Sequence, residues 1–161
     1  MVYRQMTEDS IIGSNAKQPA REVRLMFAGS QCIGLFADEI EAIAEWRPPT
    51  PLPHAPAGVL GVACIRGRML TVLEAGVLLG AGAANEHGKV VALRSDEQIG
   101  LAVERTGDVV RIVADELKPA AEKNSLVLAV VSRNGQSITV LDSRQLFATA
   151  MRGRERRHRR F

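Results

Sequence analysis

The segment LPHAPAGVLGVACIRGRMLTVLE, residues 52–74, carries the pattern that decides the fold. Two prolines open it, Pro53 and Pro56, and each fixes its own backbone and restricts the residue before it. Apolar runs then flank a central Arg66-Gly67 pair, and a pair containing glycine suits a tight turn between antiparallel strands. The segment therefore predicts a charge-poor β-hairpin with an arginine at its turn.

Arg66 can serve this hairpin in two ways. Its aliphatic stem and forked guanidinium suit a buried ion pair with a carboxylate, and they equally suit contact with another molecule. Gly61 and Gly67 suit positions where the backbone turns tightly or another chain comes close. The residues alone leave both uses of Arg66 open.

The hairpin belongs to an internal repeat, which indicates how the chain is organised. RGRMLTVLEAGVLLG from Arg66 aligns with NGQSITVLDSRQLFA from Asn134, and both have glycine second and Thr-Val-Leu followed by an acid. Upstream, IGLFADEIEAI from Ile33 aligns with IGLAVERTGDV from Ile99. Because the offsets of 68 and 66 residues nearly agree, two similar β-subdomains are predicted, at approximately residues 22–80 and 88–150, joined by GAGAAN.

The rest of the chain predicts short strands and few helices. Runs rich in valine, isoleucine and leucine end at turn residues, and further hairpin turns are expected at residues 28–30, 95–97 and 134–135. Short helices are expected near residues 38–45, 74–79 and 143–150, the first with a solvated face formed by Asp38, Glu39, Glu41 and Glu45. The predicted fold is mainly β, with roughly five strands in each subdomain closing into a small barrel.

The two ends of the chain differ from its body. Residues 1–20 are polar and aperiodic and predict a flexible leader. The last ten residues, RGRERRHRRF, carry six arginines and one glutamate, so the net charge of +3 leaves −2 on the first 151 residues. Residues 152–161 are expected to form a disordered basic tail, either simply solvated or an electrostatic tether to an acidic partner or anionic lipid. The body lacks the basic face of a nucleic-acid module.

The sequence also predicts the compartment of the protein and the state of its cysteines. Neither a signal peptide nor an apolar stretch of membrane-spanning length occurs, which predicts a cytoplasmic protein. Cys32 and Cys64 are too few for a disulfide framework or a zinc cluster, and both have apolar neighbours. They are therefore expected to be reduced core residues.

The sequence supports no catalytic or metal-binding group. Its three histidines lie in the proline-rich loop, the linker and the tail, without a partner at the spacing of a helical metal site. A triad of Cys64, His54 and Glu74 can be written, but Cys64 lacks a helix N-terminus and has no cationic neighbour beyond Arg66 to activate a thiol. The prediction is a protein without catalysis, cofactor or metal.

The hairpin, the strand that follows it and the repeated unit together resemble the CheW-like domain, the chemotaxis coupling protein family. That family's hallmark is a pair of prolines, a glycine opening a strand that ends in Arg-Gly, and an apolar strand followed by an acid and a short helix. The matching residues here are Pro53, Pro56, Gly61, Val62, Ile65, Arg66, Gly67, Val72, Leu73 and Glu74. The resemblance continues through KVVALRSDEQIGLAVERTGDVVRI and SITVLDSRQLFA and covers approximately residues 22–150.

The resemblance implies a fold, a role and partners. It implies two five-stranded, SH3-like β-barrels around a shared apolar core, with a few short helices, at residues 21–151. It also implies a non-enzymatic adaptor that couples the cytoplasmic hairpin tip of a methyl-accepting chemoreceptor to the regulatory domain of a CheA-type histidine kinase, at membrane-associated receptor arrays. The receptor-binding groove would be lined by Ile40, Gly61, Arg66, Val90 and Val109, whereas no kinase-binding residue is assigned.

The chain departs from the family's pattern at several positions. Cys64 stands where asparagine is usual, Thr71 where proline is usual, and Ala42 where a glutamate would be a natural partner for the arginine; Glu74-Ala75-Gly76 replaces Asp-Leu-Arg. These departures predict a divergent coupling protein from an alternative pathway, such as one governing surface behaviour or pili. The alternative hypothesis is a small β-barrel module that binds nucleic acid or a cyclic dinucleotide through the arginine tail, and a third is an enzyme using Cys64.

Overall fold

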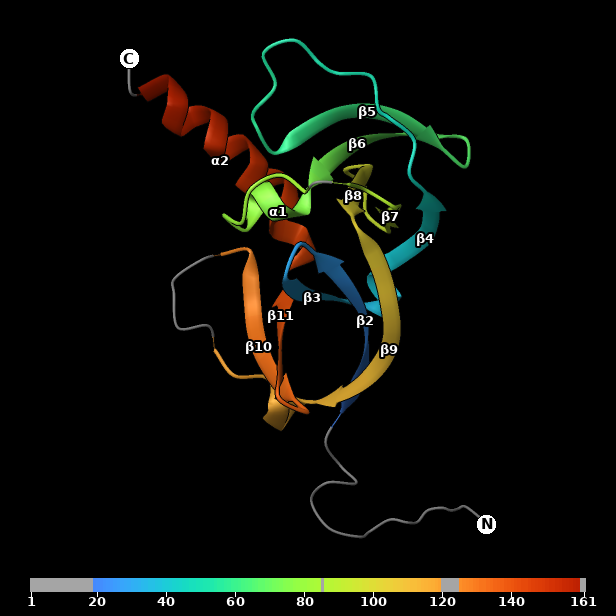
Figure 1. The fold of residues 1–161 in the computed structure, drawn as a ribbon, viewed down its shortest axis with the longest axis vertical. Coiled ribbons are helices and arrows are strands. Elements are labelled where there is room, and N and C mark those ends of the chain that lie inside the picture. The colour runs from blue at the N-terminus through green and yellow to red at the C-terminus, as the bar shows by residue number, and fades with distance from the viewer. Residues whose placement is uncertain (1–18, 85, 120–124, 160–161) are drawn as a thin grey trace, which may run out of the picture.

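The computed structural model describes residues 19–84, 86–119 and 125–159, and their strands form two five-stranded sheets (Figure 1). Sheet 1 contains, in spatial order, β10 (Val127–Arg133), β11 (Gln136–Leu141), β3 (Gln31–Phe36), β2 (Ala20–Ala28) and β9 (Arg105–Val113). Sheet 2 contains β4 (Ile40–Glu45), β7 (Lys89–Leu93), β8 (Ile99–Val103), β6 (Arg68–Glu74) and β5 (Val59–Ile65). Each sheet has one parallel pair, β11 with β3 and β6 with β8, among antiparallel neighbours.

The strands of each sheet do not follow the predicted subdomain boundaries. Sheet 2 uses the consecutive strands β4 to β8, whereas sheet 1 joins β2 and β3 to the much later strands β9 to β11. The ranges 22–80 and 88–150 therefore mark equivalent stretches of the repeat, and neither range forms a sheet by itself. The reason is the parallel pairing, because β3 lies beside β11 and β8 beside β6, so each half of the chain completes the other half's sheet.

The repeat itself is confirmed in three dimensions. The Arg66-Gly67 and Asn134-Gly135 turns both have positive φ, 53° and 81° in the first and 53° and 76° in the second. This is the conformation of a two-residue hairpin turn whose twist matches its strands. Isolated bridges also recur 68 residues apart, Thr50 with Val62 and Lys118 with Val130.

Apolar side chains form three clusters, one enclosed by each sheet and one shared between the sheets. The alternation along β7 shows the arrangement, because Val90 and Ala92 belong to the cluster of sheet 2 and Val91 and Leu93 belong to the shared core. The prediction of a mainly β fold with two five-stranded units around a shared core and a few short helices is confirmed.

Two of the three predicted helices are confirmed. The structure has α1 (Ala75–Leu78) and a 3₁₀ turn, η5 (Ser143–Gln145), that leads into α2 (Leu146–Arg159). Leu78, Leu146 and Phe147 pack these helices against the shared core. Two further 3₁₀ turns are η3 (Ala37–Glu39) and η4 (Ala114–Glu116).

The helix predicted at residues 38–45 is wrong. That segment contains the end of η3 and then β4, which pairs antiparallel with β7. The spacing of its apolar and acidic residues suits a helix, but pairing with β7 sends Ile43 to the shared core and Ala42 and Ala44 to the other face. Two of the acids predicted to form a helix face, Glu41 and Glu45, lie on this strand instead. Glu41 forms an ion pair with Arg68, and Glu45 forms one with Lys89.

The termini differ in how far the structure describes them. Residues 1–18 of the predicted leader lie outside the described residues, and β2 begins at Ala20. The predicted disordered tail differs from the structure, because α2 continues through Arg159 and projects away from both sheets (Figure 1). Arginine and glutamate are good helix formers, and Arg152 donates to Ser125 Oγ at 2.6 Å and Thr149 Oγ1 at 3.0 Å. No helix of the described residues is long and apolar enough to cross a bilayer.

Candidate docking site at the β5–β6 hairpin

A pocket of about 170 Å³ opens beside the turn of the β5–β6 hairpin. We call it the hairpin pocket, and it is lined by Glu41, Ala42, Ile65, Arg66, Arg68, Leu70 and Ala92. Three segments far apart in the sequence build it: β4, β7 and the hairpin. Ala42 lies directly opposite Ala92 in the β4–β7 register, so two small side chains meet where larger ones would fill the space.

The two arginines at the hairpin pocket have different electrostatic environments. Arg68 forms an ion pair with Glu41 across the strands. Arg66 is exposed at the turn, and it has no hydrogen bond or ion pair to any residue that the structure describes. Of the two uses that the sequence left open for Arg66, the structure thus excludes a buried ion pair within the described residues.

The other four predicted groove residues occupy different environments. Val90 is 1% exposed inside the cluster of sheet 2, and Val109 is 38% exposed on β9 of sheet 1. Ile40 is half-buried at the start of β4, where it packs against the shared core. Arg66 is thus the one of the five that lines the hairpin pocket, while Val90 supports its floor from the same cluster as Ile65 and Leu70.

Gly61 is buried in β5, and its neighbours explain why it is glycine. Its φ is +147°, a value that other residues rarely adopt. A Cβ atom there would lie 2.2 Å from the carbonyl oxygen of Thr50. Thr50 exchanges two backbone hydrogen bonds with Val62, at 2.8 and 2.9 Å. Gly61 therefore lets the proline-rich segment pack against the back of the hairpin.

Sheet 1 carries a second hollow of about 280 Å³, with a different charge balance. Its lining is Arg21, Phe36, Glu39, Leu128, Leu141, Asp142 and Arg144. Both arginines have carboxylate partners, since Arg21 lies 2.8 Å from Asp38 and Arg144 lies 3.1 Å from Asp142. The Asp142 carboxylate raises the pKa of Arg144 through a hydrogen bond and its charge. This hollow therefore offers no free cation comparable to Arg66.

The residues of the hypothetical catalytic triad are not assembled. Both oxygens of Glu74, a side chain only 1% exposed, lie within 2.7 and 2.9 Å of Nε2 of His87, and His87 stacks on Trp46. Cys64 lies opposite Met69, which is five positions before Glu74 on β6. About 16 Å of strand therefore separates the backbones of Cys64 and Glu74. The described residues also contain no cluster of three histidine, cysteine, aspartate or glutamate side chains that could hold a metal ion.

Sequence reasoning missed the pair of Glu74 and His87. Glu74 ends β6, whereas His87 lies in the linker that precedes β7. No local periodicity connects residues separated by such a linker. The sequence contains one signal of this pair, an acid that ends an apolar strand, because a carboxylate buried at that position needs a partner.

The two cysteines behave differently from the prediction that both are core residues. Cys32 is buried in sheet 1, but Cys64 is exposed, because it lies on the outward face of β5 between the inward-facing Ala63 and Ile65. Burial raises the pKa of the Cys32 thiol, and the charge of Arg105 only partly opposes this.

Alkylation distinguishes the two thiols. At about pH 8 we expect iodoacetamide to modify Cys64 at the rate of an exposed thiol and Cys32 at least about a hundredfold more slowly, until denaturant unfolds the protein. Mass spectrometry over time measures both rates. Cys64→Ser should remove the fast reaction and leave the slow one, and protection of Cys64 in the native protein would contradict the structure.

The structure thus combines two five-stranded sheets with an open pocket beside the β5–β6 hairpin. The CheW-like domain family model matches residues 22–151. Chemotaxis protein CheW of Rhizobium meliloti (strain 1021) is 29% identical over 142 residues, which cover 82% of this chain and 90% of that protein. Chemotaxis protein CheW of Thermotoga maritima is 32% identical over 89 residues, 54% of this chain and 59% of that protein.

A solved structure agrees with the fold. The crystal structure of scaffolding protein TtCheW from Thermoanaerobacter tengcongensis matches with a TM-score of 0.72 and 16% identity, covering 80% of this chain and 93% of that chain. The chain belongs to the CheW-like domain family. Proteins of this family are non-enzymatic scaffolds or adaptors, so the prediction of a protein without catalysis is confirmed.

Proposed function

We propose that the chain is a chemotaxis coupling adaptor that joins a methyl-accepting chemoreceptor to a CheA-type histidine kinase. The observation that carries this proposal is the match of the CheW-like domain over residues 22–151, which spans both sheets. Relatives named chemotaxis protein CheW and a structural neighbour named a scaffolding protein support the same role. The adaptor would work in the cytoplasm at membrane-associated receptor arrays, in an alternative pathway such as surface behaviour or pili.

The receptor's cytoplasmic hairpin tip would dock at the hairpin pocket. Helices commonly bind by laying an apolar face into an apolar groove. Arg66 would contact the tip directly, and Val109 and the half-buried Ile40 would extend the groove. Gly61 and Val90 are buried, so they would act by holding sheet 2 in shape. The kinase's regulatory domain would use a separate surface.

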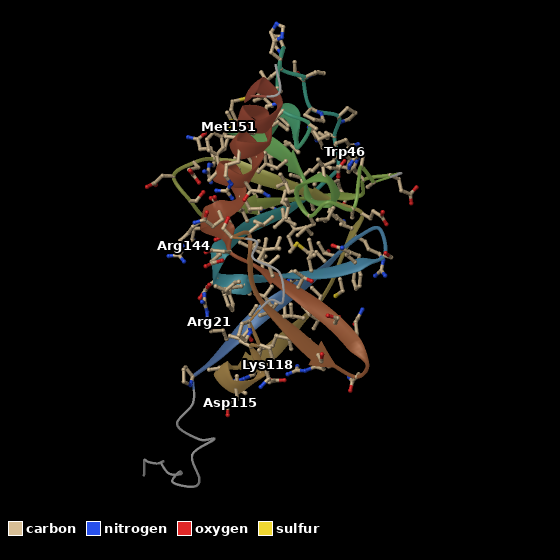
Figure 2. All side chains as sticks on the ribbon, turned by 90° about the vertical axis from the view of Figure 1, so that its left-hand side faces the viewer. Arg21, Trp46, Asp115, Lys118, Arg144 and Met151 are labelled. Atoms are coloured by element: carbon tan, nitrogen blue, oxygen red, sulfur yellow. The ribbon has the colours of Figure 1, made fainter. Side chains whose placement is uncertain are left out.

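A binding experiment with matched variants tests the proposal. Purified receptor cytoplasmic fragment and kinase regulatory domain from the same genome are titrated against the wild-type chain, Arg66→Glu and Lys118→Glu. Lys118→Glu makes the same charge change far from sheet 2, because Lys118 lies near the opposite end of the molecule from Trp46, which packs against the cluster of Ile65, Leu70 and Ala92 (Figure 2). We expect Arg66→Glu to weaken receptor binding by about tenfold or more and to leave kinase binding unchanged, because it reverses the free charge at the pocket.

Lys118→Glu should bind both partners like the wild type. Deleting residues 153–161 should also leave both affinities unchanged, whereas a module that uses its arginine tail for nucleic acid would lose salt-dependent affinity. Failure of the wild-type chain to bind either partner at tens of micromolar would overturn the coupling role.

A further inference from the structure

The hairpin pocket has the size of a single bulky side chain. Its volume is about 170 Å³, and an apolar cavity of about 150 Å³ is large enough to bind benzene. Its floor is apolar, with Leu70 1% exposed and Ile65 8% exposed. The facing methyl groups of Ala42 and Ala92 leave this space open. One aromatic ring or branched aliphatic side chain would fill it.

The charge at the pocket's rim favours an acidic neighbour for that side chain. Glu41 and Arg68 neutralise each other, so Arg66 supplies a positive charge that no described residue compensates. A guanidinium binds a carboxylate through two parallel hydrogen bonds. A purely apolar partner covering Arg66 would remove water from this charge without replacing its hydrogen bonds, and a basic partner would be repelled.

We propose that the hairpin pocket recognises a bulky apolar side chain with a carboxylate beside it, the apolar group packing over Ala42 and Ala92 and the carboxylate pairing with Arg66. This inference rests on the proposed function, because it states the chemistry by which the partner's docking segment is recognised. On a helical segment the two partner residues would lie one turn apart, since residues three or four apart share a face.

Small probes test the pocket independently of any protein partner. 3-Phenylpropionate supplies a ring and a carboxylate, 3-phenylpropionamide is its neutral counterpart, and 3-phenylpropylamine is its cationic counterpart. Each is titrated into the full chain with ¹³C-labelled alanine methyl groups. We expect the acid to shift the Ala42 and Ala92 signals with a dissociation constant of about 1 mM, several-fold below that of the amide, and we expect no saturable shift from the amine.

Variants separate the two halves of the site. Ala92→Leu or the smaller change Ala42→Val should fill the pocket and abolish the shifts that the acid and the amide cause at the remaining alanine reporter, with an unchanged circular dichroism spectrum. Arg66→Gln should make the acid and the amide bind equally, whereas Lys118→Gln should preserve the difference between them. Absence of saturable shifts at Ala42 and Ala92, or equal binding of acid and amine to the wild type, would overturn the inference.

The outcome also distinguishes this inference from the coupling role. In the receptor titration, we expect both pocket-filling variants to weaken receptor binding by about tenfold and to leave kinase binding intact. Receptor binding that ignores these variants while the wild type binds both partners would overturn the pocket and leave the coupling role standing. Probe binding to a chain that binds neither receptor nor kinase would overturn the coupling role and leave the pocket standing.

Discussion

Replacing Gly61 by alanine is expected to lower the free energy of unfolding by about 3 kcal/mol. The added methyl group would meet the Thr50 carbonyl at 2.2 Å and the Pro51 Cα at 3.1 Å. Both contacts are backbone atoms, so relief requires the proline-rich segment to move and to lose its two hydrogen bonds with Val62. The positive φ adds a further cost for any residue with a Cβ. Urea unfolding followed by circular dichroism measures the loss.

Gly67→Ala is the matched control for this prediction. Gly67 has a φ of +81°, but a Cβ there would meet no atom within 4 Å. Its replacement should therefore cost only the backbone strain, about 1 kcal/mol. Equal losses for the two variants would mean that the close approach to Thr50 contributes nothing. A Gly61→Ala variant as stable as the wild type would contradict the placement of that segment.

His87→Ala is expected to destabilise the protein by about 3 kcal/mol. The substitution would leave the carboxylate of Glu74, 1% exposed, without the imidazole that contacts both of its oxygens. It would also remove the ring that stacks on Trp46, with ring centroids 4.4 Å apart. The linker around residue 87 would lose its attachment to the end of β6, which chemical denaturation and hydrogen exchange at β6 and β7 can measure.

A double-mutant cycle isolates the charge. His87→Ala combined with Glu74→Gln should be more stable than the sum of the two single losses predicts, because the double variant buries no unpaired carboxylate. His54→Asn is the control, since His54 is exposed with a φ of +60° that asparagine tolerates, and its change should stay within about 0.5 kcal/mol. Strict additivity of the Glu74 and His87 losses would show that the pair does not act as a unit.

Gly61→Ala and His87→Ala also provide stability controls for the receptor-binding experiment. Gly61→Ala and His87→Ala act on the stability of sheet 2 and its connections, so any loss of receptor binding should follow the unfolded fraction and recover on cooling to conditions where the variant is folded. Arg66→Glu changes an exposed charge. Its effect on receptor binding should persist in a fully folded protein.

Part of the candidate site was predictable from neighbouring residues. Arg66 was expected at a hairpin turn, and the turn exists with the positive φ values that an Arg-Gly pair in a two-residue loop adopts. The pocket beside it was not predictable. Its shape depends on Ala42 facing Ala92 across fifty residues of sequence, and the segment containing Ala42 was predicted as a helix. Spacing of acids and apolar residues cannot reveal which strand lies alongside.

Cys64 and Glu74 illustrate the same limit. Both lie in apolar runs that predict buried strands, and the two residues end in opposite environments. Cys64 is exposed because it lies on the outward face of β5, whereas its neighbours Ala63 and Ile65 face the cluster of sheet 2. Glu74 is buried at the end of β6, where His87 of the linker contacts its carboxylate and in turn stacks on Trp46, which follows β4.

The sequence by itself determined the β class, the turns, two short helices and the repeat of 68 residues, because these depend on side chains that are close along the chain. The tertiary structure alone decided that β2 and β3 complete the sheet of β9 to β11, that residues 40–45 form a strand, and that Arg66 lies beside a pocket without a carboxylate partner among residues 19–84, 86–119 and 125–159. Each of these depends on parallel or antiparallel pairing between distant segments. Such pairing is selected because it buries the three apolar clusters together, and the pattern of residues along one strand does not indicate which distant strand will pair with it.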